Sequence, residues 1–503
     1  MSAVAGVFVR GGGPVPRGVV AHISGRQREM GPDAERFAWS GPVGMAHRVL
    51  HTEAGPRPHP FAQREGSLAC MEGRVDNAGE LTAALGGEGR GRAAAEVALA
   101  AYLQWGVEGL ARLVGDFALA LWDAPAGRLL LATDGMGRRP LYYRLTPESV
   151  CWASKSRPLA EALGLPPEPD DEFVAAFLAN RPSAAGPIRG TAQLPGGHIL
   201  VVERGRSELA RYWSIDPDRR IEHRTDGEYE EHFREVFDQA VACRIQTDAP
   251  VFCELSGGLD SSTILSSADR LLKDGRAAAP SIHTVSYTFD QSSSSDERLY
   301  VRLMEEHVGR AGIHLSENDC PLLAPLPGEF LPDHPATELC FLERQDRVTR
   351  EMQAAGSRVL LCGIGGDQAF WSTPPAALPL ADLAARGRVV ETLWRAGEWS
   401  RALRWPYLKT LWVGAVWPNL PRRWQARAQR QNPVGEWLAP EFVARMDLRE
   451  RALSMSDDVG YCLPSASRQY GLFRQTMRTY ALEWFSSEGY VDMRFPYLDR
   501  RLV

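Results

Sequence analysis

The sequence contains very little lysine. Lys155, Lys273 and Lys409 are the only lysines among 503 residues, so arginine supplies nearly all of the 57 basic side chains. Together with 63 acidic residues this gives a net charge of -6. Proteins that bind nucleic acids usually carry a basic domain, so the charge balance predicts no nucleic-acid partner.

Paired cysteines and long apolar runs are missing as well. The 8 cysteines stand far apart without a CxxC pair, which indicates neither a zinc site nor a disulfide framework. The longest apolar patch, residues 411–417, is too short to span a membrane, and no apolar segment follows a basic N-terminal start. These absences predict a cytoplasmic protein that does not associate with membranes.

The length and composition predict a soluble protein of two or three domains. The chain is too long for one core, and its 44% hydrophobic and 24% charged residues are typical of globular proteins. Short strand and turn signals fill the first part and end near residues 203–217. We therefore expect one domain over residues 1–205 and a second over residues 206–503.

The clearest motif lies in residues 251–262, Val-Phe-Cys-Glu-Leu-Ser-Gly-Gly-Leu-Asp-Ser-Ser. An apolar strand runs directly into two glycines and then into a helical pattern, which leaves unpaired backbone N–H groups at the helix start. Such a turn binds anions, and a carboxylate such as Asp260 can hold a divalent metal ion. The alternative is an ordinary strand–helix turn in which Asp260 is only a helix-start charge. The residues expected to contact a phosphate group are Ser256, Gly257, Gly258, Leu259, Ser261 and Ser262.

Two further strands belong with this motif. Residues 281–289 and 357–362 are apolar, and the second strand runs into a glycine-rich turn that contains Gly363, Gly365 and Asp367. Strands that alternate with helices indicate a parallel sheet with ligands at its carboxyl ends. We expect a nucleotide to contact Leu255, Val285 and Ser286 there, although simple strand packing would also explain Val285 and Ser286. Asp260 and Asp367 would share a Mg²⁺ ion that bridges the phosphates of ATP.

These motifs resemble a known family. The heptad Ser256–Ser262 is similar to the pyrophosphate loop of ATP pyrophosphatases and differs from a Walker loop, since it has no lysine. The whole chain resembles the asparagine synthetase superfamily, and within it most closely the lasso-peptide macrolactam synthetases, or lasso cyclases. The resemblance implies an α/β protein: an N-terminal αββα glutaminase-like sandwich of the N-terminal-nucleophile type, followed by a doubly wound parallel-sheet ATP-pyrophosphatase domain.

The N-terminal segment departs from the glutamine-hydrolysing relatives at two positions. Gly6 matches the glycine that follows their nucleophilic cysteine, and Ala5 stands in place of that cysteine. Ala94 occupies the place of an aspartate that holds the amino group of glutamine. Ser2 is out of register as a substitute nucleophile, so we expect an inactive glutaminase-like domain.

The C-terminal segment also departs from the pattern of its relatives. Ile364 stands where asparagine synthetases have an acidic residue and β-lactam synthetases a tyrosine, so a general base would come from the block around Tyr480, Glu483 and Glu488. We expect Glu483 to be catalytic, although a surface helix would explain it equally well. Residues 492–499 resemble the ExRxPFLD turn of the family. Relatives have a lysine beyond this turn that neutralises charge on the reaction intermediates. No lysine follows the turn before Val503 in this sequence, so we expect either that a C-terminal tail is missing or that an arginine replaces this lysine.

Residues 394–430 combine six tryptophans with seven arginines. Tryptophan and arginine often carry binding energy at interfaces, so this segment is a candidate peptide groove. A helical core with arginines extending to solvent explains it equally well.

The resemblance implies ATP-dependent closure of a ring in one peptide. A side-chain carboxylate of Asp or Glu would be adenylated, and the peptide's N-terminal amine would attack it. Beyond this precursor peptide, the implied partners are a leader-binding protein and a leader peptidase. The alternatives are an asparagine synthetase driven by ammonia or glutamine, a β-lactam synthetase-like enzyme and a non-catalytic scaffold that binds nucleotide.

Overall fold

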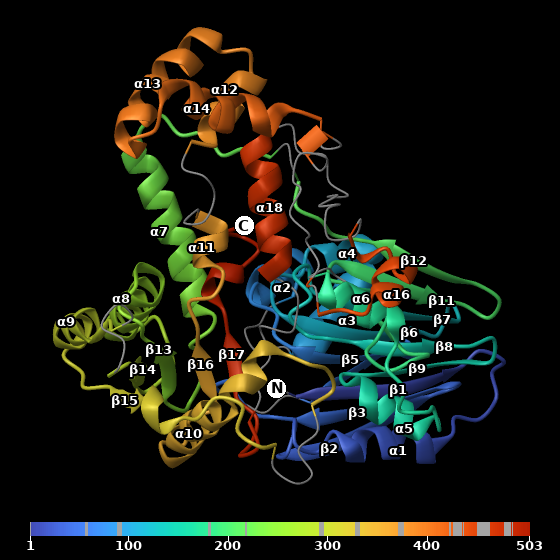
Figure 1. The fold of residues 1–503 in the computed structure, drawn as a ribbon. Coiled ribbons are helices and arrows are strands. Elements are labelled where there is room, and N and C mark those ends of the chain that lie inside the picture. The colour runs from blue at the N-terminus through green and yellow to red at the C-terminus, as the bar shows by residue number, and fades with distance from the viewer. Residues whose placement is uncertain are drawn as a thin grey trace.

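The chain forms an antiparallel-sheet part followed by a parallel-sheet part (Figure 1). The computed structural model describes residues 2–55, 59–87, 93–179, 183–216, 219–290, 296–326, 332–370, 377–421, 424–425, 435, 437–449, 463–476, 484 and 486–503. Within these residues, no helix combines the length and the hydropathy that crossing a bilayer requires.

The N-terminal part is a sandwich of two six-stranded sheets whose strand pairs are antiparallel. The strand orders are β10-β8-β9-β1-β3-β2 and β12-β11-β7-β6-β5-β4. The strands are β1 (Ala3–Val9), β2 (Ala34–Ser40), β3 (Val43–Val49), β4 (Phe61–Arg64), β5 (Ser67–Gly73), β6 (Phe117–Asp123), β7 (Arg128–Thr133), β8 (Tyr142–Leu145), β9 (Ser149–Ala153), β10 (Ala192–Gln193), β11 (His198–Val202) and β12 (Ser207–Arg211).

Helices cover both outer faces of this sandwich. The helices are α1 (Arg17–Arg26), α2 (Ala78–Ala84), α3 (Ala94–Trp105), α4 (Val107–Ala111), α5 (Ser156–Ala162) and α6 (Asp171–Leu178). Strand β1 is apolar on both faces because Val4 and Phe8 enter the core between the sheets, whereas Ala5 and Val7 pack toward α1 and α5. The layers are therefore helix, sheet, sheet, helix, as the sequence predicts.

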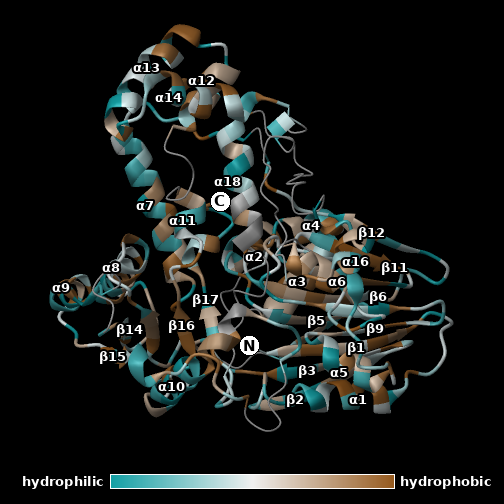
Figure 2. Ribbon diagram, in the orientation of Figure 1, coloured by the Kyte–Doolittle hydropathy of each residue, from teal (hydrophilic) through white to brown (hydrophobic). Residues whose placement is uncertain are grey.

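The C-terminal part is built on a five-stranded parallel sheet of order β15-β14-β13-β16-β17. Its strands are β13 (Val251–Glu254), β14 (Ile282–Thr288), β15 (Ile313–Ser316), β16 (Val359–Leu361) and β17 (Asp492–Arg494). The order reverses between β13 and β16, and ligands of open parallel sheets bind at the carboxyl ends beside such a reversal. Figure 2 colours β16 as hydrophobic, as expected for a strand covered on both faces.

Helices lie on both faces of the parallel sheet. The α-helices are α7 (Asp226–Ala242), α8 (Leu259–Lys273), α9 (Arg298–Val308), α10 (Leu342–Ala354), α11 (Gly366–Phe370), α12 (Pro379–Ala385), α13 (Val389–Leu403), α14 (Tyr407–Leu411), α16 (Pro440–Arg445) and α18 (Pro464–Thr476). Side chains of α7, α8 and α9 pack on one face, and those of α10 pack on the other. Helices α12, α13 and α14 form a lobe at the far end of α7 and α18 (Figure 1). The doubly wound arrangement confirms the predicted fold class.

The short turns of helix in this part are η1 (Glu317–Asp319), η2 (Thr337–Phe341), η3 (Trp412–Val416), η4 (Trp417–Asn419) and η6 (Pro496–Leu498). Strand β12 pairs with β11, so residues up to Arg211 belong to the N-terminal sandwich.

Buried ion pairs join the two parts. Arg139 donates to Asp492 at 2.7 Å, and neither side chain is more than 4% exposed. Burial alone would raise the pKa of Asp492, but the charges of Arg139 and Arg494 hold that pKa well below its ordinary value. The carboxylate is therefore ionised in the interior and depends on these arginines.

Candidate functional site

The first glycine turn connects β13 to α8. Gly257 has a φ of +81°, and a Cβ on it would lie 2.7 Å from the Cβ of Tyr300, so only glycine fits. The backbone N–H of Ser256 donates to the Ser261 hydroxyl at 3.2 Å, and the N–H of Gly258 donates to the Ser256 hydroxyl at 3.2 Å. Hydrogen bonds to serine hydroxyls therefore fix the conformation of this turn, which precedes a helix of 15 residues.

Two other residues of this turn are free to meet a ligand. The side chain of Leu259 is 87% exposed. The buried Oγ of Ser262 has no hydrogen-bond partner. A buried hydroxyl without a partner is costly, so a phosphate oxygen or a water molecule would satisfy it.

The second glycine turn connects β16 to α11. Gly365 has a φ of +103°, and a Cβ on it would lie 2.5 Å from Cδ2 of Leu498. The N–H of Gly366 donates to the carbonyl of Gly363 at 3.2 Å, which closes the turn before Asp367. Asp367 lies in the first turn of α11 and is exposed.

The two turns meet at Asp260. A Cβ on Gly366 would lie 2.3 Å from the carboxyl carbon of Asp260, and one on Gly363 would lie 3.4 Å from its Cβ. Burial and the negative charge of Asp367 raise the pKa of Asp260, although the backbone N–H of Asp367 donates to this carboxylate and opposes the shift. A divalent cation would remove this repulsion, so the two carboxylates fit a Mg²⁺ ion and could hold one here.

The predicted nucleotide contacts lie at the carboxyl ends of neighbouring strands. The N–H of Leu255 donates to the carbonyl of Val285 at 2.9 Å, and both side chains are buried, so a ligand could contact only their backbone. The buried Oγ of Ser286 has no hydrogen-bond partner. These residues share one edge with the two turns, and their role in binding ATP stays a prediction. Tyr480 and Glu483 lie outside the described residues.

The sequence reading missed a cluster beside the turns. Glu254, the last residue of β13, accepts a hydrogen bond from Tyr287 Oη at 2.8 Å and another from the Cys362 thiol. The guanidinium of Arg344 lies 4.4 Å above the Tyr287 ring. The sequence did contain a signal for this cluster, because Glu254 is the only charged residue in the apolar run from Val251 to Leu255.

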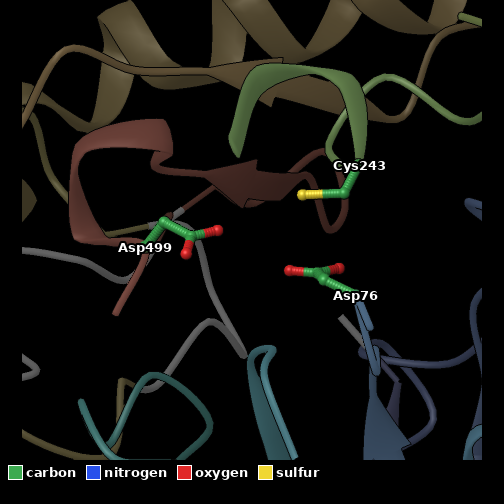
Figure 3. Close-up of side chains that lie close together, drawn as sticks. All are labelled: Asp76, Cys243 and Asp499. Carbon is green, nitrogen blue, oxygen red and sulfur yellow. The ribbon is translucent and has the colours of Figure 1, made fainter. Parts of the chain in front are cut away.

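Asp76, Cys243 and Asp499 also lie together, as Figure 3 shows. Arg244 pairs with Asp499 at 2.8 Å, and Arg74 pairs with Asp76 at 3.1 Å. Burial raises the pKa of the Cys243 thiol to about 12, so the sulfur stays protonated at neutral pH. Arginines already neutralise the two carboxylates, and this cluster is a buried ion-pair network rather than a metal centre.

The predicted glutaminase positions carry no reactive group. Ala5 is 1% exposed and pairs with Ala46 and Ala153. A Cβ on Gly6 would lie 2.0 Å from the Trp152 ring, so the sheet is closely packed there. Two polar side chains of the same part, Arg48 and Asn77, make contacts within the sandwich: Arg48 pairs with Glu35 at 2.7 Å, and Asn77 bonds the backbone of residues 112 and 114.

Comparison with known proteins gives two family matches. Residues 1–213 match the glutamine amidotransferase domain, and residues 232–503 match asparagine synthase. Amidase chry2 of Gibberella zeae is 27% identical over 68% of this chain and 53% of its own length. Asparagine synthetase B of Escherichia coli is 25% identical over 85% of this chain and 74% of its own length. The carboxyethyl-arginine beta-lactam-synthase of Streptomyces clavuligerus is 28% identical over 52% of this chain and 47% of its own length. The chain thus spans about half the length of several curated relatives.

Proposed function

Because the chain belongs to the asparagine synthase family, we propose that it forms an amide bond at the expense of ATP. A carboxylate oxygen attacks the α-phosphorus of ATP and pyrophosphate leaves. An amine then attacks the acyl carbon, the C–N bond forms, and the C–O bond to AMP breaks. The observation that carries this proposal is the meeting of two glycine turns at Asp260.

The residues of the two turns have distinct roles in this reaction. Ser256, Ser261 and the backbone at the start of α8 hold the leaving pyrophosphate, since helix N-termini favour anions. Asp260 and Asp367 would hold Mg²⁺, and this ion neutralises negative charge on the phosphates when it is bound.

We further propose that the carboxylate and the amine belong to one peptide, as in lasso cyclases. Ala5 supplies no nucleophile for releasing ammonia from glutamine, which supports an amine from another source. Trp394, Trp412 and Trp424 are exposed near or within the lobe of α12, α13 and α14 and offer a surface for a peptide. A leader-binding protein and a leader peptidase are the further partners of this proposal.

The cytoplasm remains the proposed location of the reaction. The described cysteines are free thiols, as a reducing compartment requires.

The test is pyrophosphate release with different substrates. The purified protein receives ATP and Mg²⁺ with a synthetic peptide that has a free N-terminal amine and an Asp or Glu a few residues later. Release that depends on the peptide supports the proposal. Release that depends instead on aspartate with ammonia would identify an asparagine synthetase, and no release with any substrate would indicate a scaffold that binds nucleotide.

A further inference from the structure

The cluster around Glu254 places a carboxylate among the apolar side chains of the central strand. Val251, Cys253 and Leu255 of the same run pack on the α8 side of the sheet, whereas Phe252 packs on the α10 side. Glu254 follows the same alternation as Phe252 and meets Tyr287, which also packs on the α10 side. Glu254 is half-buried there and is the one charged side chain of the run.

The neighbours of Glu254 donate hydrogen bonds to its carboxylate. Burial and the Glu254 charge raise the pKa of Tyr287 well above its ordinary value, so the phenol stays protonated and donates. Burial likewise raises the pKa of Cys362, and its thiol also donates to Glu254. Arg344 covers the Tyr287 ring at 4.4 Å and the Phe341 ring at 4.2 Å, which fixes the orientation of the phenol. The carboxylate is thus held in position by two donors.

The cluster adjoins both turns of the proposed reaction site. Glu254 lies two residues before Ser256, and Cys362 immediately precedes Gly363, where an added Cβ would lie 3.4 Å from the Cβ of Asp260. Ile364 and Tyr287 both pack against the buried hydrophobic residues on the α10 side of the sheet. The Glu254 carboxylate therefore lies on the α10 side of the sheet. Helix α8, whose first residues would hold the phosphates, lies on the other side.

We propose that Glu254 accepts the proton of the attacking amine. This inference rests on the proposed amide-forming reaction and names its base. The amine nitrogen forms the new bond to the acyl carbon, one N–H proton moves to Glu254 Oε, and the bond between the acyl carbon and the AMP oxygen breaks. Ile364 cannot accept a proton, and Glu254 is a carboxylate within the same region of the sheet. Tyr287 and Cys362 act as positioning residues.

The test separates the two half-reactions in the full-length protein. For a peptide that releases pyrophosphate, the Glu254→Gln variant should retain peptide-dependent exchange of pyrophosphate into ATP, because adenylation needs no base for the amine. Amide formation should fall on the order of a hundredfold or more, in kcat rather than in KM. Hydroxylamine, which is unprotonated at neutral pH, should trap the acyl-adenylate equally fast in both proteins.

Glu305→Gln is the matched control. Glu305 is a buried glutamate at the parallel sheet, and its carboxylate is bonded to Thr284 and His314 rather than to residues of the two turns. This variant should form the amide at the wild-type rate. Equal loss of exchange and amide formation in Glu254→Gln would show a structural role and overturn the inference, as would an unchanged rate of amide formation. Absence of exchange in the wild-type protein would instead overturn the proposed function itself.

Discussion

The two halves of the chain differ in the residues that surround their strands. In the N-terminal half, Ala5 is buried and the sheet around Gly6 is filled by the Trp152 ring. In the C-terminal half, two strand ends carry glycine turns, and the turn before Asp367 closes on the carboxylate of Asp260. A close-packed apolar strand end contributes stability, whereas a carboxylate whose pKa is raised by burial and by a second carboxylate is typical of functional sites. The comparison favours a structural role for the first half and assigns the proposed chemistry to the second half.

The largest expected effect tests the supporting role of the N-terminal half. Arg139→Ala removes one of the two buried arginines that pair with Asp492, so the free energy of unfolding should fall by about 3 kcal/mol, because Arg494 alone would then compensate the ionised carboxylate. Denaturant unfolding of the full chain measures it. Arg358→Ala is the control, since its pair with Asp33 also joins the halves but is partly exposed, and it should cost at most about 1 kcal/mol. Equal effects of the two substitutions would contradict the supporting role.

The next effect concerns the chemistry of the C-terminal half. Asp260→Asn and Asp367→Asn should each lower substrate-dependent pyrophosphate release about a hundredfold or more, because a neutral amide stabilises a metal–phosphate charge poorly. Asp274→Asn, at the exposed opposite end of α8, should keep the wild-type rate. If Asp260→Asn or Asp367→Asn kept near-normal turnover at saturating Mg²⁺, the replaced aspartate would not be a metal ligand.

A smaller effect tests the shape of the first turn. Gly257→Ala should lower the free energy of unfolding by about 1–3 kcal/mol and weaken ATP binding, because φ is +81° and the added methyl meets Tyr300. Gly258→Ala places its methyl 3.3 Å from Ser256 Oγ at a φ of -71° and should leave the melting temperature nearly unchanged. Calorimetry of both variants with and without ATP makes the comparison, and similar melting temperatures would contradict the account of the turn.

The last expectation is that the N-terminal half has no glutaminase activity. Glutamine should not be hydrolysed by the purified protein, because Ala5 offers no nucleophile. A glutaminase assay measures this directly. Sustained glutamate release that disappears in Ser2→Ala would show that Ser2 serves as the nucleophile after all.

Local patterns were sufficient to predict much of the fold and the two turns. The expected helix that starts at Leu259 does start there, because the glycines before it and the apolar spacing after it are local signals. The expected strand over residues 357–362 is shorter, Val359–Leu361, since its ends pass into the neighbouring loop and turn. The encounter of Asp260 with the turn of Asp367 followed from the rule that parallel strands end at one edge.

Contacts between distant side chains could not be predicted in this way. Glu254, Tyr287 and Cys362 come from three strand ends, and no periodicity relates them. The pair of Arg244 with Asp499 joins residues far apart in the sequence through packing of α7 against the last turn of the chain. Such partners depend on the strand order and on rotamers, which the hydrophobic pattern does not specify.

The most direct test of the central claim is the mass of the product. The protein is incubated with ATP, Mg²⁺ and the synthetic peptide, and the products are analysed by mass spectrometry with parallel assays of AMP and pyrophosphate. Ring closure should give a peptide lighter by one water, with AMP and pyrophosphate in equal amounts. Blocking the N-terminal amine should prevent the ring while pyrophosphate is still released. An unchanged peptide, with aspartate converted to its amide by ammonia, would contradict the ring-closing function.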